Sequence, residues 1–326
     1  MQAWFCETLS GPEGLVWKEV PTPEPGPGEV RIAIRAASLN FPDILIVQGK
    51  YQFRPEPPFS PGGEIAGVVH SVGPGVASWM KGDHVVAMLT YGGLAERVVV
   101  PDSAVFRVPD GLDPAVAASV LTTYGTSWHA LVDRAAIRAG EWLLVLGAAG
   151  GVGVAAMQIG KLLGAKVIAA ARGADKLAFC RENGADAVID YASEDLKARV
   201  KDITGGHGAD VVYDPVGGAF TESALRACAW NGRVLVIGFA AGDIPKVATN
   251  LCLLKGASIV GVFWGSFVMR EPVRARAQIA DILERVSRGE LTPRIHARFP
   301  LARGVEAMRE LETRRVMGKV VVTLGD

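Results

Sequence analysis

The chain has 326 residues, and its 34 Lys and Arg residues balance its 34 Asp and Glu residues, so the formal net charge is zero at pH 7. This balance gives no electrostatic reason to expect a nucleic acid or an anionic membrane as a partner. The sequence contains no apolar run of the roughly 20 residues that cross a membrane, and its first residues lack the pattern of a signal peptide. We therefore expect a cytoplasmic protein, and the length allows two domains.

The residues before Thr122 are rich in glycine and proline and contain short strands. Residues 28–36 alternate between apolar and polar side chains, which is typical of a strand with one face in solvent. Residues 67–73, 82–87 and 94–100 continue in this style, with glycine-containing turns between them. We expect a small domain of β-barrel type here.

After Leu121 strands and helices alternate, which predicts a parallel sheet covered by helices. The expected strands are Trp142–Leu146, Lys166–Ala171, Ala187–Asp190, Asp210–Tyr213, Arg233–Ile237 and Ser258–Phe263. The tail from Glu271 onward supplies two amphipathic helices and two further strands, at residues 294–299 and 319–324. We expect this tail to return to the first domain, which makes that domain discontinuous.

A glycine-rich turn follows the first of these strands and opens an apolar helix. Because a second strand follows the helix, the turn fits a dinucleotide-binding βαβ unit better than a plain tight turn. Glycines let the backbone approach a pyrophosphate and let the helix pack on the strand, and the helix N-terminus offers N–H groups to phosphates. The residues expected to bind the cofactor here are Ala149, Gly150, Gly151, Val152 and Gly153.

The end of the second strand indicates which dinucleotide binds. An NAD site usually has an acidic residue about 20 residues beyond the glycines, where it holds the ribose 2′-hydroxyl. This chain has Arg172 at the strand tip and Lys176 one helical turn further. Two cations favour a 2′-phosphate, so we expect NADP(H). The alternative is that both are solvated surface cations, and Asp175 lies between them in the sequence.

Short motifs along the whole chain occur in an order that resembles one known family. They are Ser38–Asp43, Pro61–Gly67, Gly82–Val85, Gly147–Gly153, Asp214–Gly218 and Gly318–Lys319. The chain resembles the zinc-independent quinone oxidoreductase (zeta-crystallin) branch of the medium-chain dehydrogenase/reductase superfamily. The resemblance implies an α/β fold with a Rossmann-type doubly wound parallel sheet and a discontinuous GroES-like β-barrel domain. We expect the GroES-like catalytic domain at residues 1–124 and 266–326 and the Rossmann dinucleotide-binding domain at residues 125–265.

The residues do not suit a catalytic zinc ion, which needs three protein ligands and one open position. In the alcohol dehydrogenases of this superfamily a Cys stands where this chain has Asn40, and a His stands where it has Gly63. No cysteine follows Gly82 in the region of the structural zinc lobe, and the five histidines do not pair at ligand spacing. We expect no bound metal and interpret Glu64 as a structural carboxylate.

The resemblance also indicates residues for catalysis and cofactor binding. Asn40 takes the vacated metal-ligand position near the nicotinamide, and Thr126 is similar to the residue that orients its carboxamide. Asp43 and Tyr51 are further catalytic candidates, Tyr51 as a hydrogen-bond donor to a developing enolate or phenolate. Further cofactor contacts are implied for Lys176, Tyr191, Gly217, Phe239 and Phe263.

Each of these residues also has an ordinary interpretation. Asn40 and Asp43 can form the turn before a helix, Thr126 can cap a helix, and Tyr51 and Tyr191 can be semi-buried aromatic residues. These alternatives stay open at the level of the sequence.

The expected activity is NADPH-dependent, metal-free transfer of hydride to a quinone, a small-molecule electron acceptor. One alternative is reduction of the C=C bond of enals, enones or enoyl thioesters, which Leu45 favours because some quinone reductases of this branch carry a tyrosine there. A second is a cofactor-binding protein with little catalysis in a structural or RNA-associated role, against which the neutral charge argues. The resemblance implies a homodimer joined through the edge strand Ser258–Phe263.

Overall fold

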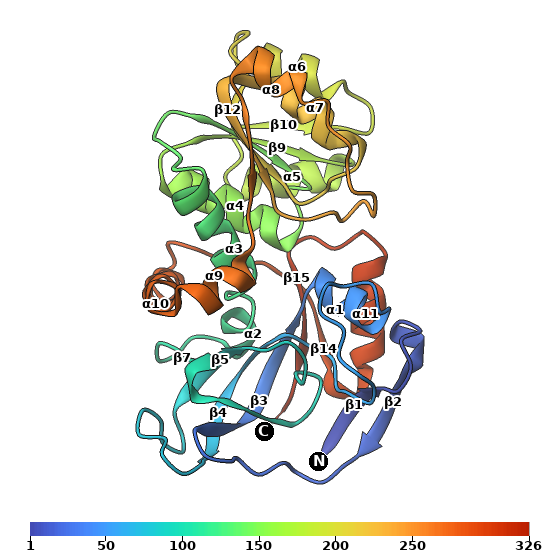
Figure 1. Cartoon of the computed structure of the whole chain (residues 1–326), viewed down its shortest axis with the longest axis vertical. Helices are drawn as coiled ribbons and strands as arrows, with labels where there is room; N and C mark the ends of the chain where they lie inside the picture. Colours follow the sequence, from blue (N-terminus) through green and yellow to red (C-terminus); the bar gives the residue numbers. More distant parts are fainter. Residues whose placement is uncertain (326) are drawn as a thin grey trace. The chain divides into compact units, whose positions relative to one another are not determined.

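The structure is a computed structural model that describes residues 1–325 (Figure 1). The chain divides into two compact units. Unit 1 comprises Met1–Thr122, Arg276–Arg288 and the chain from Pro293 onward, and unit 2 comprises Thr123–Ala275 and Gly289–Thr292. Between residues 1 and 325, no helix is both long and apolar enough to cross a membrane.

Unit 1 contains a seven-stranded sheet and a separate two-stranded hairpin. The sheet order is β14-β15-β3-β4-β5-β7, and β6 also pairs with β3. β14 and β15 run parallel, and the other pairs are antiparallel. Among the described strands no ladder joins β14 to β7, so the predicted barrel is open. The strands are β1(Gln2–Cys6), β2(Leu15–Glu19), β3(Glu29–Leu39), β4(Glu64–Val72), β5(His84–Met88), β6(Arg97–Pro101), β7(Val105–Arg107), β14(Ile295–Pro300) and β15(Lys319–Thr323).

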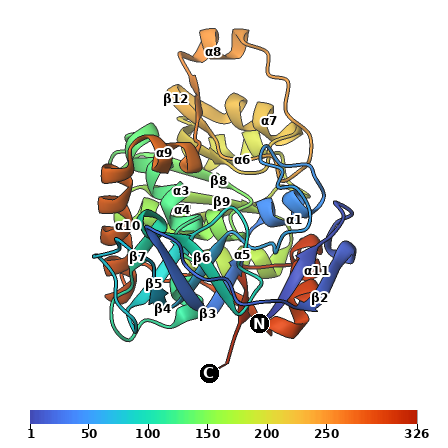
Figure 2. The ribbon, with the colours of Figure 1, turned by 60° about the horizontal axis from the view of Figure 1, so that its bottom comes forward.

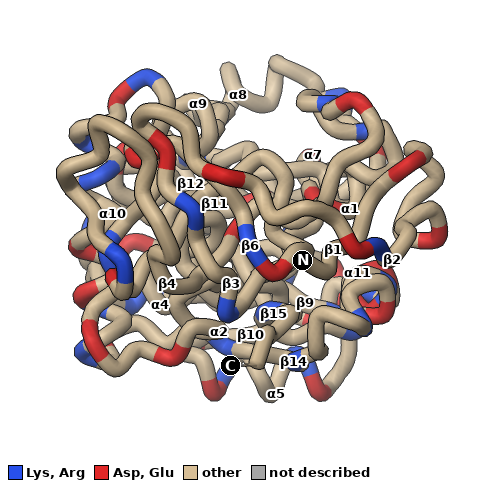
Figure 3. Tube along the Cα trace, turned by 90° about the horizontal axis from the view of Figure 1, so that it is seen from below, with Lys and Arg blue, Asp and Glu red and all other residues tan. Residues whose placement is uncertain are grey.

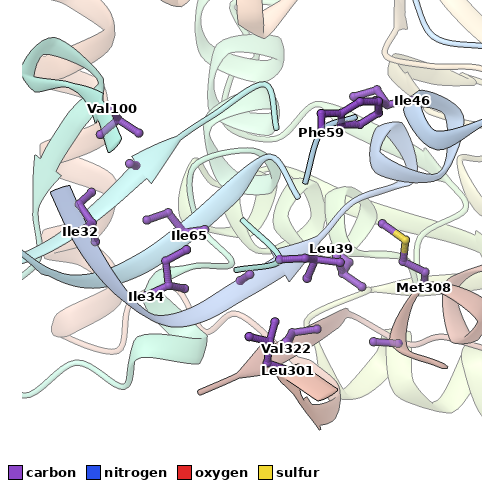
Figure 4. Packing of buried hydrophobic residues seen from close by; sticks show 14 of the residues in the cluster. Ile32, Ile34, Leu39, Ile46, Phe59, Ile65, Val100, Leu301, Met308 and Val322 are labelled. Carbon is purple, nitrogen blue, oxygen red and sulfur yellow. The ribbon is translucent and has the colours of Figure 1, made fainter. Parts of the chain in front are cut away.

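Apolar side chains of these strands pack together in a single core. Figure 4 shows members of this cluster from several segments, including Leu39 on β3, Ile65 on β4, Val322 on β15 and Met308. Burying one such side chain stabilises the fold by about 1.5–3 kcal/mol. The helical segments of the unit are η1(Pro12–Gly14), α1(Phe41–Val47), η2(Asp102–Ala104), α2(Pro114–Ala117), most of α10(Pro272–Ser287), η4(Leu301–Arg303) and α11(Gly304–Glu312).

Unit 2 is built on a six-stranded parallel sheet with the order β10-β9-β8-β11-β12-β13. Counted along the chain from β8, this order is 3-2-1-4-5-6, the arrangement of a dinucleotide-binding doubly wound sheet. The prediction of a Rossmann-type α/β fold is therefore confirmed. The strands are β8(Trp142–Leu146), β9(Lys166–Ala171), β10(Ala187–Asp190), β11(Ala209–Asp214), β12(Cys228–Val236) and β13(Ser258–Gly261).

The central strand β8 is apolar along its whole length because helices cover both faces of such a sheet. Leu143, Leu144, Val145 and Leu146 on β8 have no exposed surface. The helices α3 and α4 pack side by side (Figures 1 and 2). The helical segments are α3(Thr123–Trp128), the π-helical η3(His129–Arg134), α4(Gly151–Leu162), α5(Ala174–Glu182), α6(Leu196–Ile203), α7(Ala219–Ala227), α8(Asn250–Lys255) and α9(Trp264–Arg270).

The tail of the chain from Pro293 onward belongs to unit 1. In Figure 1 the red end of the chain lies beside the blue strands of this unit, and β15 pairs antiparallel with β3. In this register Val320 lies opposite Leu39. Continuing the register by one residue brings Lys319, at the start of β15, opposite Asn40, just after β3. β4 flanks the other side of β3, so three strands meet at this end of the sheet.

Candidate functional site

The glycine-rich turn of unit 2 joins β8 to α4. Gly147 has a φ of 58°, which favours glycine, and Gly150 is the N-cap residue of α4. A Cβ added at Gly153 would lie 2.6 Å from the carbonyl oxygens of Gly147 and Ala148, so only glycine lets the helix begin this close to the strand. α4 has 12 residues, and its first N–H groups and dipole favour an anion. This backbone fits the pyrophosphate of a dinucleotide.

The residues from Ala149 to Gly153 lie in this turn and in the first turn of α4. Helix α3 supports the turn, because the Ser127 hydroxyl donates a hydrogen bond to the carbonyl oxygen of Val152 over 3.1 Å. The same hydroxyl lies 2.8 Å from the Tyr213 hydroxyl. Thr126 is half-buried within α3, next to Ser127 and away from the end of the helix. A capping role for Thr126 therefore does not apply.

The loop after β11 lies against the same turn. A carboxylate oxygen of Asp214 accepts hydrogen bonds from the backbone N–H groups of Val216, at 2.9 Å, and Gly217, at 2.8 Å. A Cβ added at Gly147 would lie 3.0 Å from a methyl carbon of Val216, and one added at Gly217 would lie 2.9 Å from the ring of Phe239. Gly217 and Phe239 thus lie beside the carboxyl ends of β8 and β11, where a doubly wound sheet binds its ligand.

Phe263 lies apart from this group. It is the N-cap residue of α9, follows the edge strand β13 and is 57% exposed. Two strands, β11 and β12, separate β13 from β8 in the sheet. The structure therefore does not bring Phe263 to the glycine-rich turn within unit 2.

Arg172, Lys176 and Tyr191 gather at the ends of β9 and β10. Burial lowers the pKa of Lys176, and the nearby Arg172 charge lowers it further. The two cations therefore repel each other. The backbone N–H of Tyr191 donates to the carbonyl oxygen of Ala171 over 3.3 Å, and its ring packs 4.7 Å from that of Phe220. A dianionic phosphate beside the two cations would relieve their mutual repulsion. The arrangement suits a 2′-phosphate.

Unit 1 carries a second group of interacting residues, the buried polar cluster of Asn40, Asp43, Glu64 and Lys319. The amide nitrogen of Asn40 donates to a carboxylate oxygen of Glu64 over 3.0 Å and more weakly to the carbonyl oxygen of Ser38 over 3.3 Å. The amide oxygen of Asn40 accepts a short hydrogen bond from the Lys319 ammonium group. Both ends of this amide are therefore engaged.

The ionisable members of the cluster are almost completely inaccessible to solvent. The exposed fractions of Asp43, Glu64 and Lys319 are 3%, 0% and 5%. Lys319 also donates to the carbonyl oxygen of Leu39 over 2.8 Å, and Glu64 accepts from the backbone N–H of Thr122 over 3.0 Å. Buried charges persist where partners of opposite charge and hydrogen bonds compensate for lost hydration. The cluster meets this condition.

The sequence around Asn40 explains the local geometry. Asn40 is the N-cap residue of α1, and its backbone N–H donates to the carboxylate of Asp43 over 2.7 Å. Asn and Asp at these two positions are typical of a helix start, with Pro42 in the first turn. The ordinary turn-forming interpretation of Asn40 and Asp43 is thus part of the structure, and it also delivers both side chains to the cluster.

The pKa values reflect this burial. Burial raises the pKa of Asp43 to about 6, although the hydrogen bond from Asn40 and the charge of Lys319 act in the opposite direction. Burial also raises the pKa of Glu64 and lowers that of Lys319, and in each case the oppositely charged partner counteracts the shift. With all three groups ionised, the charges −1, −1 and +1 sum to −1, and one proton on Asp43 makes the cluster neutral.

Tyr51 lies close to this cluster. Its ring is half-buried, and burial, followed by the charge of Asp43, raises the pKa of its hydroxyl. Tyr51 therefore remains a neutral hydrogen-bond donor at physiological pH. The structure thus brings Asn40, Asp43 and Tyr51 together in unit 1.

The side chains of the cluster do not form a set of metal ligands. Asn40 uses its amide oxygen to bind Lys319. Gly63 has no side chain that could bind a metal ion, although it lies beside Asp43. Within residues 1–325, no group of three or more His, Cys, Asp or Glu side chains could hold a metal ion. An ammonium group also disfavours a nearby metal cation by charge repulsion.

The sequence alone did not suggest a role for Lys319. It belongs to the motif Gly318–Lys319, and it opens an otherwise apolar strand. A charged residue at the start of a buried strand is a signal for a paired group, but the partner is set only by the register of β15 on β3. Thr122, which bonds Glu64 through its backbone, carries no such signal.

Two protein families match the chain. Residues 26–110 match the family described as "Alcohol dehydrogenase GroES-like domain", which agrees with the expected GroES-like domain. Residues 151–284 match the family described as "Zinc-binding dehydrogenase". The donor set described above does not fit the zinc that this second description mentions.

Similar proteins cover the whole chain. The "Quinone oxidoreductase-like protein 2 homolog" of Nematostella vectensis is 39% identical over 324 residues, 98% of this chain and 88% of that protein. The quinone oxidoreductase of Thermus thermophilus, solved alone and with NADPH, has 36% identity and a TM-score of 0.85 over 99% of this chain and 100% of its own. The Escherichia coli quinone oxidoreductase complexed with NADPH has 27% identity and a TM-score of 0.92 over 99% and 100%.

Proposed function

Because the chain belongs to the medium-chain dehydrogenase/reductase family, we propose that it is a metal-free reductase that passes hydride to a quinone. It is an oxidoreductase of the quinone oxidoreductase-like type, and its cofactor is NADP(H). When bound, this cofactor supplies the hydride. The observation that carries the proposal is the buried polar cluster, in which the Asn40 amide, bound by an ammonium group, takes the position of one zinc ligand.

Unit 2 is proposed to hold the cofactor. The turn from Ala149 to Gly153 receives the pyrophosphate on backbone N–H groups, with Gly217 and Phe239 beside it. Arg172, Lys176 and Tyr191 receive the 2′-phosphate, and Thr126 orients the nicotinamide carboxamide. We propose these roles for the domain at residues 125–265 and catalysis for residues 1–124 and 266–326.

Unit 1 is proposed to act on the electron acceptor. Asn40 and Tyr51 donate hydrogen bonds to the acceptor oxygen as negative charge develops on it, and solvent delivers the proton. Asp43 acts from inside the cluster by fixing the backbone of Asn40. Positioning and exclusion of water then supply most of the rate enhancement.

The second candidate function is reduction of the C=C bond of enals, enones or enoyl thioesters. Leu45 favours it, because this half-buried residue of α1 places an alkyl group where some quinone reductases of this branch carry a phenol. A cofactor-binding protein with little catalysis remains the alternative from another class.

We propose a homodimer joined at the edge of the sheet of unit 2. β13 is the edge strand, and it lies beside an exposed apolar patch. The exposed fractions of Trp230, Leu253, Leu254 and Ile259, which form this patch, are 70%, 81%, 68% and 43%. Apolar side chains on an edge strand and the helix beside it favour pairing with a second copy.

A cytoplasmic location and the absence of a nucleic-acid partner are part of the proposal. Figure 3 shows Lys and Arg interspersed with Asp and Glu along the chain. The formal net charge is zero, and nucleic-acid binding depends on an excess of positive charge.

The test is NADPH oxidation by the purified, chelator-treated protein with two panels of acceptors, quinones on one side and enals, enones and enoyl thioesters on the other. The same panels are repeated with NADH. Turnover with quinones and a preference for NADPH is the expected result. Faster turnover of the second panel would assign the alkene reductase, and no turnover with either panel would assign the non-catalytic alternative.

A further inference from the structure

Resting on the function proposed above, the geometry points to Lys319 as a positioning residue that acts through the Asn40 amide. We propose that its buried ammonium group fixes and polarises this amide, so that the Asn40 N–H edge stabilises negative charge on the acceptor oxygen. Lys319 thereby supplies through an amide the positive charge that a metal ion would supply directly.

The hydrogen bond from Lys319 determines the orientation of the Asn40 amide. An asparagine side chain has one edge that accepts and one that donates. In this cluster the Lys319 ammonium donates to the Asn40 oxygen, which leaves the N–H edge as the part of the amide that can serve a ligand. An N–H donor suits a carbonyl oxygen that gains negative charge when hydride arrives.

One of the two Asn40 N–H groups is available to a substrate. One Asn40 hydrogen is committed to Glu64 over 3.0 Å, a bond to a carboxylate. The contact with the carbonyl oxygen of Ser38 is longer, at 3.3 Å, and bonds a neutral acceptor. A developing oxyanion is a stronger acceptor than a neutral carbonyl group, so this contact can be exchanged for one to the substrate. Asn40 is only partly buried, unlike its ionisable partners.

The charge of Lys319 also polarises the Asn40 amide. Hydrogen bonds in a chain strengthen one another at low dielectric constant. A cation on the amide oxygen draws electron density from the nitrogen, which makes the N–H group a better donor. Lys319 is 5% exposed, so water screens its charge little. Glu64 and Asp43 both favour the charged form of Lys319.

A structural role is the competing explanation, since Lys319 also ties the start of β15 to the end of β3. The two roles predict different effects on a series of acceptors. Loss of a structural tie slows all acceptors by the same factor. Loss of a polarising charge slows the weakest electron acceptors most, because their transition states carry the most negative charge on oxygen.

The test uses variants of the full-length protein with NADPH and a series of substituted quinones of increasing reduction potential. Lys319→Gln alone leaves two buried carboxylates without a cation and can fail to fold. The double variant Lys319→Gln/Glu64→Gln keeps the cluster at the wild-type net charge of −1, carried by Asp43. Lys18→Gln is the matched control, since Lys18 forms a partly exposed ion pair with Glu7 in the same unit.

We expect the double variant to lose about tenfold in kcat with the weakest acceptors and little with the strongest, with KM for NADPH unchanged. Asn40→Leu removes the donor itself. In the Asn40→Leu background, we expect the double variant to cause no further change in the slope of log kcat against the reduction potential of the acceptor. The control leaves all rates unchanged. An equal loss across the series, or full additivity with Asn40→Leu, would overturn the proposal.

The side-chain amide resonance of Asn40 gives a second readout that needs no turnover. It is assigned by its disappearance in Asn40→Leu, and we expect its N–H protons to shift upfield in the double variant relative to Glu64→Gln alone, because only the double variant removes the cation from the amide. An unchanged resonance would overturn the proposed contact. If the wild-type protein turns over no acceptor with NADPH, the proposed function fails, while this resonance still decides whether Lys319 acts on Asn40.

Discussion

The glycine-rich turn of unit 2 and the buried polar cluster of unit 1 use different chemical groups. The turn acts through backbone groups, and its side chains are small so that Gly153 can lie against two carbonyl oxygens. The cluster acts through charged side chains that have almost no exposed surface. The turn belongs to one continuous segment, whereas the cluster joins residues from opposite ends of the chain. The turn is therefore encoded by one short stretch of sequence, but the buried polar cluster depends on tertiary structure.

The largest effect is expected from closing the turn with Gly153→Ala. The new methyl group would lie 2.6 Å from two backbone oxygens, so α4 must shift. We expect NADPH affinity to fall by about 100-fold and the free energy of unfolding by about 3 kcal/mol. Gly160→Ala in the same helix is the control, because its methyl group meets a movable Leu143 side chain. Calorimetric titration measures the NADPH affinity of both variants, and equal affinities would contradict the role of the turn.

The second prediction separates the two cofactors. Replacing Arg172 and Lys176 together by alanine removes the cations proposed to hold the 2′-phosphate, and we expect NADPH affinity to fall by roughly 30-fold, about 2 kcal/mol. NADH affinity stays the same, since NADH has no such phosphate. Equal losses for the two dinucleotides would show that the cations support the fold and not the phosphate.

The third prediction concerns the cluster and its pH dependence. The pKa of Asp43 is raised to about 6 from the usual 3.8, so the folded state binds its proton more tightly than the unfolded state does. Its contribution to stability is therefore fully present below pH 4 and is lost as the pH rises through about 6. Asp43→Asn cannot ionise and avoids this loss. Its free energy of unfolding should rise relative to wild type by roughly 2 kcal/mol between pH 4 and pH 7.

Urea unfolding of both proteins at several pH values measures this difference. A stability difference that does not change with pH would mean that Asp43 is not held in the buried, partly protonated state that the cluster implies.

The smallest effect is expected on assembly. Leu254→Glu introduces a charge into the apolar patch on α8, and we expect the proposed dimer to dissociate at least tenfold more easily, about 1.4 kcal/mol. Light scattering over a range of concentrations measures this. A wild-type protein that is monomeric at every concentration would remove the proposed homodimer.

The sequence predicted most of unit 2 because its signals are local. The strand, turn and helix around Gly150 lie side by side in the sequence, and the six strands followed from apolar runs between helices. The last strand ends at Gly261 and not at Phe263, because Phe263 serves as the N-cap of α9.

The cluster could be predicted only in part. Motif resemblance identifies Asn40 and Asp43, and the sequence indicates a structural carboxylate at Glu64. Their hydrogen bonds to one another and to Lys319 depend on β15 lying beside β3 in one register. A shift of two residues would keep the same side chains on the core face and lose the Lys319–Asn40 contact. No pattern within either segment carries that information.

Metal content measured together with turnover distinguishes a metal-free reductase from a zinc enzyme. Protein purified without added metal is assayed for zinc and for NADPH oxidation with its best acceptor, then again after exhaustive treatment with a chelator. We expect far less than one zinc ion per chain and the same rate before and after treatment. A rate that is lost with the chelator and restored by zinc would contradict this expectation.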